Sequence, residues 1–141
     1  MFEIFHGRPG RESLIAHYLN VDSHQAVAAS RSGFYRLALK ELNFLVKRNP
    51  RVLLDVGCSF GHFMEMAAAG GWRVMGVDLL AEGVRASRQR GPSAAVFEGD
   101  LLEARFDPCS LHAVTMWDVL DQLEDPGAAL ESASVSWLRE A

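Results

Sequence analysis

Four aspartates follow short apolar segments along the chain, and two glycines come directly after the first of them. The acids are Asp55, Asp78, Asp100 and Asp118. A single aspartate often only begins a turn or a helix, but four in corresponding places suggest a shared task. Carboxylates accept hydrogen bonds, and glycines allow close approach to the backbone. This pattern predicts a site for a polar organic ligand.

The two glycines, Gly57 and Gly61, separate an apolar segment from a helical one. At such a turn the positive end of the helix dipole attracts an anionic group. Asp78 follows about twenty residues later, where an acid can accept hydrogen bonds from both hydroxyls of a ribose. A ligand with a ribose and an anionic end fits both features.

Common nucleotide motifs do not fit this turn. Gly57, Ser59 and His62 stand at the three glycine positions of the dinucleotide fingerprint G-x-G-x-x-G, and no Gly-Lys-Ser/Thr follows a strand. The two cysteines, Cys58 and Cys109, form neither a disulfide framework nor a metal-spaced cluster. We expect Cys58 to be a small buried side chain, and we expect no metal site.

Composition sets broader limits on the protein. The 141 residues are 49% hydrophobic and 23% charged, which is typical of one globular domain. A formal net charge of -4 argues against a nucleic-acid partner. We find no leader segment and no apolar run long enough to cross a bilayer, so we expect a cytoplasmic protein without a membrane partner.

Strand and helix signals alternate from residue 51 onward. Strands are predicted at 51–56, 72–78, 94–100 and 111–118, and helices at 61–69, at 81–90 and after Asp125. Asp125 is a suitable N-cap, with Pro126 at the first helical position. The residues predicted to share the packed face of this helix are Leu130, Ala133, Ser134, Trp137 and Leu138. This alternation predicts an α/β fold with a doubly wound, mostly parallel sheet. Because the carboxyl ends of parallel strands share one edge, the four acids should converge there.

Residues 1–50 are predicted to be helical. We expect this N-terminal segment to pack on the domain formed by residues 51–141 and to form part of a lid over the acceptor site. Two apolar stripes recur at helical spacing. The first consists of Leu14, Ile15, Tyr18 and Leu19. The second begins near Gly33, ends at Asn49-Pro50, and consists of Phe34, Leu37, Ala38, Leu42 and Leu45.

From about residue 51 to 138 the sequence resembles class I S-adenosylmethionine-dependent methyltransferases. Five motifs occur in the family's order: an Asp-x-Gly-x-x-x-Gly turn, an Asp ending the second strand, Gly-Asp after the third, Asp-Val-Leu-x-x-Leu after the fourth, and an Asp-Pro helix start. The resemblance implies a Rossmann-like sheet of order 3-2-1-4, S-adenosylmethionine as cofactor, and methyl transfer to a small-molecule acceptor.

The resemblance also implies roles in the glycine loop. The backbone of Gly57, Cys58, Ser59 and Gly61 would lie against the methionine part of the cofactor. Asp55 would orient this loop or reach the cofactor's ammonium group. Ser59 stands where the family usually has Gly; its Cβ narrows the turn, whereas its hydroxyl could bind the cofactor carboxylate.

The adenosine half would be held by the next two strand ends. By resemblance, Asp78 would bind the ribose and Leu79 would lie against the adenine. Asp100 would accept a hydrogen bond from the adenine amino group, and Leu101 would cover the ring. The helix that begins near Leu80 lacks the Ser or Thr cap that is frequent in the family.

The backbone at Trp117 and Asp118 would line the methionine side. A sulfonium methyl is already activated, so transfer depends mainly on holding the acceptor in line. A base is needed only if the acceptor must lose a proton. The candidate bases are His62, His112, Tyr35 and Asp121.

The family's sheet typically continues beyond the fourth strand and its helix, where this sequence stops. The fourth strand would then present an open edge. We expect either a homodimer that covers this edge or a chain that is a fragment of a longer protein. A non-catalytic module that binds S-adenosylmethionine or S-adenosylhomocysteine is the alternative function; the glycine spacing disfavours a dinucleotide-dependent oxidoreductase.

Overall fold

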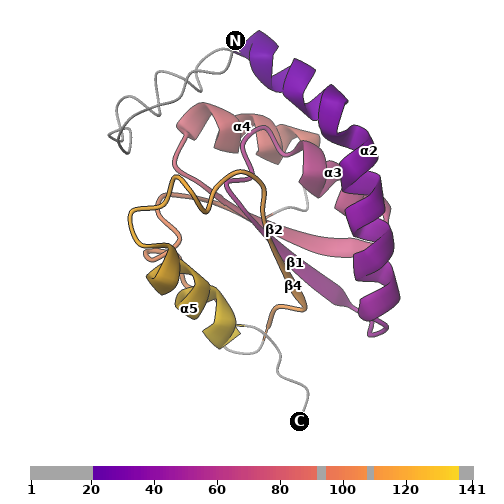
Figure 1. Ribbon diagram of the computed structural model, residues 1–141, viewed down its shortest axis with the longest axis vertical. Helices are drawn as coiled ribbons and strands as arrows, with labels where there is room; N and C mark the ends of the chain where they lie inside the picture. The colour runs from indigo at the N-terminus through magenta and orange to yellow at the C-terminus, as the bar shows by residue number, and fades with distance from the viewer. Residues whose placement is uncertain (1–20, 92–94, 108–109, 137–141) are drawn as a thin grey trace.

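The computed structural model describes residues 21–91, 95–107 and 110–136. In this part of the chain four parallel strands form one sheet in the order β3-β2-β1-β4 (Figure 1). The strands are β1 Arg51–Val56, β2 Trp72–Asp78, β3 Ala95–Glu98 and β4 Ala113–Met116. The predicted α/β class and the 3-2-1-4 order are confirmed.

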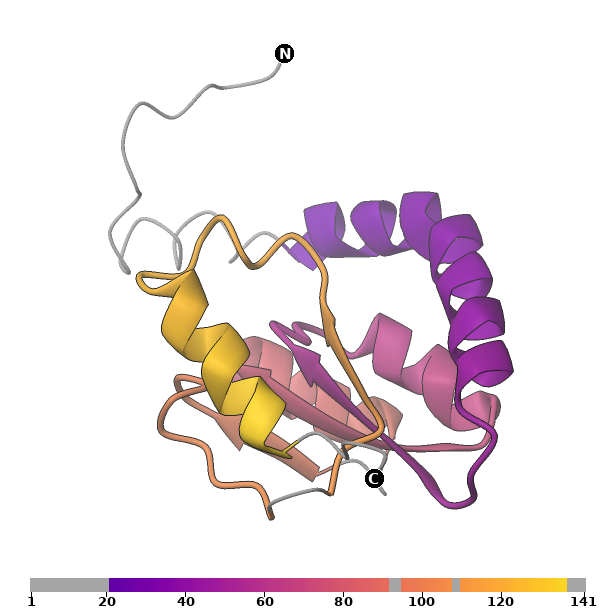
Figure 2. The same cartoon turned by 60° about the horizontal axis from the view of Figure 1, so that its bottom comes forward.

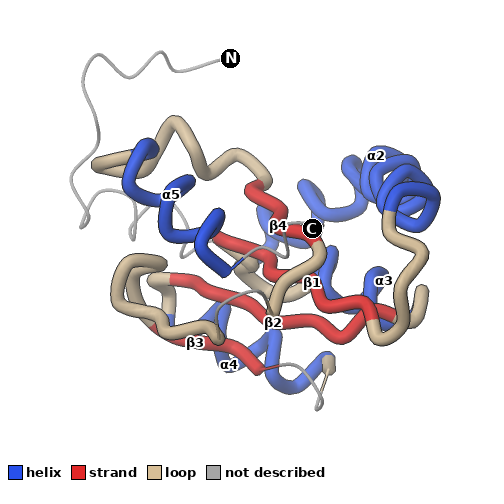
Figure 3. The backbone as a smooth tube through the Cα atoms, turned by 90° about the horizontal axis from the view of Figure 1, so that it is seen from below, coloured by secondary structure: helices blue, strands red, loops and turns tan. Residues whose placement is uncertain are grey.

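Helices cover both faces of the sheet. They are α2 Val21–Leu45, α3 His62–Ala69, α4 Ala81–Arg90 and α5 Pro126–Ser136. Figure 3 shows α3 and α4 on one side of the strands and α5 on the other. α2 packs on α3 and curves over the loops at the carboxyl ends of the strands (Figure 2). Among the described helices, none is both long and apolar enough to span a membrane.

The central strand β1 explains the two-layered core. Leu53 and Leu54 are both fully buried, because successive side chains of a strand point to opposite faces. Leu53 belongs to a core cluster with α2, α3 and α4. Leu54 belongs to the opposite cluster, which includes Ala129 of α5. The apolar sequence of β1 is therefore that of a strand buried on both faces.

The register of α2 differs from the predicted stripe. The helix runs through Gly33, and Tyr35 and Leu39 are its buried residues, each 8% exposed. Phe34 and Leu37 are 60% and 56% exposed, so the prediction that they face the core is wrong. Tyr35 replaces them because its ring packs on Phe63 and Trp117. The first predicted stripe lies outside the described residues.

The last helix begins as predicted but packs with smaller side chains. Asp125 Oδ1 accepts a hydrogen bond from the N–H of Ala128 at 2.9 Å, which confirms the N-cap. Ala129 and Ala133 are buried, whereas Leu130 is 51% exposed, contrary to its predicted place on the packed face. The other predicted members of that face, Trp137 and Leu138, lie outside the described residues.

Candidate functional site

A cavity of about 220 Å³ lies at the carboxyl ends of the strands. Its wall is formed by α2, the glycine loop and the segments after β2, β3 and β4. Ten of the residues predicted for the site line it: Asp55, Gly57, Cys58, Ser59, Asp78, Leu79, Asp100, Leu101, Trp117 and Asp118. Gly61 does not line the cavity, so the lining does not support its predicted contact with the cofactor.

Both glycines of the loop have left-handed backbone conformations, with φ of 73° at Gly57 and 79° at Gly61. A Cβ on Gly61 would lie 2.7 Å from Cβ of Ser87, so this glycine allows α4 to pack closely on the loop. A Cβ on Gly57 would lie 2.3 Å from Cγ2 of Val119. Gly57 therefore lets the segment after β4 close over the loop.

Gly57→Ala should lower the free energy of unfolding by about 2–3 kcal/mol, because the variant combines a positive φ with a steric clash. Chemical denaturation measures this loss. In a Val119→Ala background the clash disappears and only the backbone cost of about 1–2 kcal/mol should remain. Equal losses in both backgrounds would contradict the role assigned to Val119.

Asp78 connects the end of β2 to the glycine loop. Its Oδ2 accepts a hydrogen bond from the N–H of Ser59 at 2.7 Å, and its Oδ1 accepts one from the N–H of Leu80 at 2.8 Å. Leu80 is the N-cap residue of α4 and provides no side-chain hydrogen bond, as predicted. The carboxylate of Asp78 also lines the cavity.

Ser59 adopts a φ of 47°, which is uncommon for a residue with a Cβ. The bond from its N–H to Asp78 holds this conformation. Its hydroxyl oxygen is buried and has no hydrogen-bond partner among the described residues. Ser59 is therefore accommodated in the turn, and its hydroxyl is free to bind a ligand. Neighbouring Cys58 is buried, which raises the pKa of its thiol and agrees with the predicted small filler.

Asp55 is the most buried acid of the site, with an exposed fraction of 1%. Burial raises its pKa to about 7, and the negative charge of Asp78 adds to this effect. The hydroxyl of Thr115 donates a hydrogen bond to Asp55 Oδ1 at 2.6 Å and opposes the rise. Near neutral pH this carboxyl can lose its proton readily when a cation is placed beside it.

The end of β3 supplies a turn with an acid and an apolar side chain. Asp100 Oδ1 accepts a hydrogen bond from the N–H of Leu102 at 2.8 Å. This bond fixes the carboxylate at the cavity wall. Leu101 is 3% exposed and belongs to the core below the cavity. Leu79, at the end of β2, is 38% exposed.

Aromatic rings form the wall between α2 and β4. The Trp117 ring centroid lies 4.9 Å from that of Phe63, 5.1 Å from that of Tyr35 and 5.5 Å from that of Phe34. Its indole Nε1 is buried and has no partner in the described part of the chain. Like the Ser59 hydroxyl, this N–H is a donor that a ligand in the cavity could satisfy.

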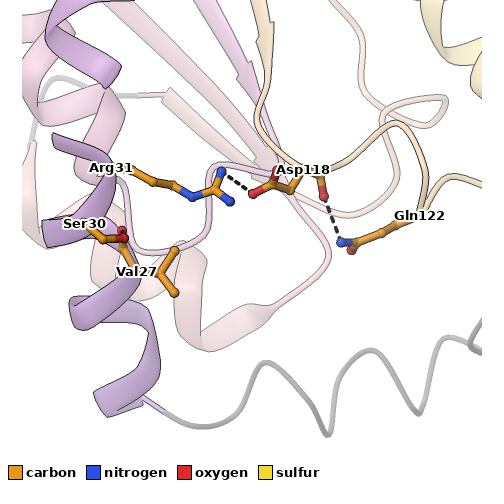
Figure 4. Close-up of polar contacts among 5 residues, drawn as sticks. All are labelled: Val27, Ser30, Arg31, Asp118 and Gln122. Carbon is orange, nitrogen blue, oxygen red and sulfur yellow. Dashed lines mark hydrogen bonds and ion pairs between the residues drawn. The ribbon is translucent and has the colours of Figure 1, made fainter. Parts of the chain in front are cut away.

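Arg31 was not found from the sequence, although it lines the cavity from α2. Its guanidinium forms an ion pair with the carboxylate of Asp118, which follows β4 (Figure 4). One helical turn separates Arg31 from Tyr35, and this i, i+4 spacing is the only sequence signal that could have placed it. The incorrect register predicted for α2 concealed that signal.

A model of the methyltransferase domain family matches residues 54–135, which is more than half of the chain. The chain belongs to this family. The matched range begins in β1 and ends in α5, so it contains the glycine loop and all four strand ends of the site. S-adenosylmethionine is the cofactor of class I enzymes of this kind. No match was found among curated protein sequences.

Solved structures support the fold of this methyltransferase domain. The amino pentose methyltransferase CalS10 from Micromonospora echinaspora, bound to S-adenosylmethionine, is 21% identical with a TM-score of 0.68 over 82% of this chain and 51% of its own. A TehB-like S-adenosylmethionine-dependent methyltransferase from Corynebacterium glutamicum is 20% identical, with a TM-score of 0.59 over 82% of this chain and 68% of its own. An S-adenosylmethionine-dependent methyltransferase from Mesorhizobium loti is 23% identical, with a TM-score of 0.61 over 71% of this chain and 47% of its own. This chain thus spans about half the length of two of them.

The structure places only some of the four candidate bases at the cavity. His62 and Tyr35 line the cavity, and Asp121 does not. His112 Nδ1 instead accepts a hydrogen bond from the N–H of Val52 at 3.1 Å, which gives it a structural place beside β1. Burial raises the pKa of Tyr35, so its hydroxyl is a hydrogen-bond donor at neutral pH.

Proposed function

We propose that this chain binds S-adenosylmethionine in the cavity and transfers its methyl group to a small-molecule acceptor. The observation that carries the proposal is the convergence of Asp55, Asp78 and Asp100 on one cavity, each from a different strand end. When bound, the cofactor supplies an activated sulfonium methyl group. The protein then has to hold the cofactor and the acceptor in line and exclude water.

The polar groups of the cavity fit the two ends of this cofactor. Asp78 would bind the ribose hydroxyls, and Asp100 would bind the adenine amino group between Leu79 and Leu101. Asp55 would lie beside the ammonium. The buried donors of Ser59 and Trp117 would be satisfied by cofactor or acceptor oxygens, which removes the cost of leaving them unpaired.

Calorimetric titration with S-adenosylmethionine, S-adenosylhomocysteine and NAD tests this assignment. We expect both sulfur-containing ligands to bind in the micromolar range, about -8 kcal/mol, and NAD not to bind, because the glycine loop lacks the dinucleotide spacing. Binding of NAD without binding of S-adenosylhomocysteine would refute the proposal.

A non-catalytic cofactor-binding module is the second candidate. This chain covers 51% of CalS10 and 47% of the Mesorhizobium loti methyltransferase, so methyl transfer by this chain itself is a proposal separate from cofactor binding. Methyl transfer from labelled S-adenosylmethionine to a panel of small hydroxyl, amine and carbon acceptors separates the two functions. Cofactor binding without transfer to any acceptor would favour the module.

The homodimer stays a prediction. β4 ends the strand order and pairs with β1 on one side, so its other edge has no strand partner in the described part of the chain. Sedimentation at micromolar concentration would detect a dimer. A well-folded monomer would exclude it.

A further inference from the structure

We propose that the methyl acceptor is an aromatic acid, and that Arg31 binds its carboxylate in exchange for the carboxylate of Asp118. The inference rests on the proposed function for the statement that this ligand is the methyl acceptor. It adds the chemical class of the acceptor and a binding role for Arg31. We call the part of the cavity that is lined by Arg31, Tyr35, Phe63 and Trp117 the acceptor end.

The strand order separates the acceptor end from the proposed adenosine contacts. Asp78 lines the cavity at the end of β2, Asp100 lines it after β3, and Trp117 lines it after β4. β3 and β4 are the two outer strands of the sheet, so Asp100 and Trp117 lie at opposite ends of the cavity. Since the adenosine is assigned to Asp78 and Asp100, a second ligand has to occupy the end near β4.

Aromatic side chains form the wall of the acceptor end. Tyr35 comes from α2, Phe63 from α3, and Trp117 follows β4. The centroid of each ring lies within 5.2 Å of the other two. A planar aromatic ligand can extend this packing with further edge-to-face or offset contacts. The wall therefore favours an aromatic ring over an aliphatic chain.

Arg31 supplies the positive charge of the acceptor end. It is the only lysine or arginine among the described residues that line the cavity. Tyr35 follows four residues later on α2, so the two side chains lie on the same face of the helix. A guanidinium group binds a carboxylate through two parallel hydrogen bonds. Arg31 can thus hold an acidic substituent while the ligand ring lies against Tyr35.

Asp118 occupies the guanidinium of Arg31 in the free protein (Figure 4). The side chains of Arg31 and Asp118 are 35% and 57% exposed, so the ion pair is weak and its exchange costs little. Asp118 is the more exposed partner, and water can hydrate its carboxylate after it leaves Arg31. A cationic ligand would instead take Asp118 and leave the less exposed Arg31 unpaired, which costs more. The exposures therefore favour an anionic ligand.

Four ring compounds test the class of ligand in NMR titrations of the free and the S-adenosylhomocysteine-saturated protein. 4-Hydroxybenzoate should bind roughly tenfold more tightly than 4-hydroxybenzamide and 4-hydroxybenzylamine, because only the acid can pair with Arg31. 4-Hydroxycyclohexanecarboxylate should bind roughly two- to tenfold more weakly than 4-hydroxybenzoate, because it lacks the aromatic ring. Equal binding of the acid and the amide, tighter binding of the amine, or no binding of the acid at about 10 mM would overturn the proposal.

Two variants separate direct binding by Arg31 from a structural role of the ion pair. Arg31→Gln and Asp118→Asn both remove the pair. Arg31→Gln should weaken binding of 4-hydroxybenzoate roughly ten- to 100-fold, whereas Asp118→Asn should strengthen it roughly two- to fivefold, because the competing carboxylate is gone. Arg36→Gln is the control, since Arg36 is exposed and does not line the cavity. Changes of the same sign in both ion-pair variants would overturn the proposal.

Titration of the same variants with S-adenosylhomocysteine separates the acceptor end from the cofactor contacts. Arg31→Gln should change the dissociation constant of S-adenosylhomocysteine by less than about twofold. A larger loss for S-adenosylhomocysteine than for 4-hydroxybenzoate would make Arg31 a contact to the methionine part and would overturn the proposal. If the wild type does not bind S-adenosylhomocysteine, the proposed function fails. The titrations of the free protein then still decide whether Arg31 binds an aromatic acid.

Discussion

Asp78→Ala should raise the dissociation constant of S-adenosylhomocysteine by roughly 30- to 1000-fold, or about 2–4 kcal/mol. Two effects combine. The proposed ribose contact is lost, and the N–H groups of Ser59 and Leu80 lose the carboxylate that orders the glycine loop. Isothermal titration measures the change, and a thermal transition measured alongside shows that the variant folds.

Glu98→Ala is the matched control for Asp78→Ala. Glu98 lies opposite Asp78 in the β2–β3 register, is exposed and does not line the cavity. Its removal also deletes one negative charge at this edge, yet affinity should change by less than twofold, about 0.4 kcal/mol. If both substitutions lowered affinity equally, the loss would be due to the missing negative charge and not to the ribose contact of Asp78. An unchanged affinity in Asp78→Ala would place the ribose elsewhere.

Asp55 should make the free energy of unfolding fall as pH rises from about 4 to about 7. Its pKa is raised from 3.8 to about 7 in the folded protein. Between these values the folded state binds more protons than the unfolded state, so stability decreases with increasing pH. Three pH units correspond to about 4 kcal/mol. Asp55→Asn keeps the shape and the acceptor for Thr115 and should remove this dependence.

The measurement is the difference in unfolding free energy between wild type and Asp55→Asn at several pH values. Comparing the two proteins cancels the titration of other groups. Thr115→Val removes the hydrogen bond that stabilises the charged form, so it should extend the dependence to higher pH. A difference that stays constant from pH 4 to pH 8 would show that Asp55 is not held protonated.

The sheet and the acids of the site could be predicted because both follow from local patterns. Apolar runs bounded by glycines marked β1 and β2, and parallel pairing then brought Asp55, Asp78 and Asp100 to one edge. The Asp125 cap is also local, since it depends on the N–H three residues later.

Features that depend on tertiary contacts could not be predicted. The face that α2 turns inward is decided by the fit of Tyr35 against Phe63 and Trp117, which lie far away in the sequence. Arg31 remained hidden for the same reason. The two loop glycines have identical local signals, yet Gly57 faces Val119 and Gly61 faces Ser87, and only Gly57 lines the cavity.

The most direct test of the account is an ¹H–¹⁵N correlation spectrum of the 141-residue chain titrated with S-adenosylhomocysteine. The largest shift changes should occur at the amides of Gly57, Ser59, Leu79 and Leu101, with small changes at the amides of Arg73 and Ala95 at the opposite strand ends. Shift changes confined to other surfaces, or none at millimolar ligand, would contradict the claim that this cavity binds the methyl-donor cofactor.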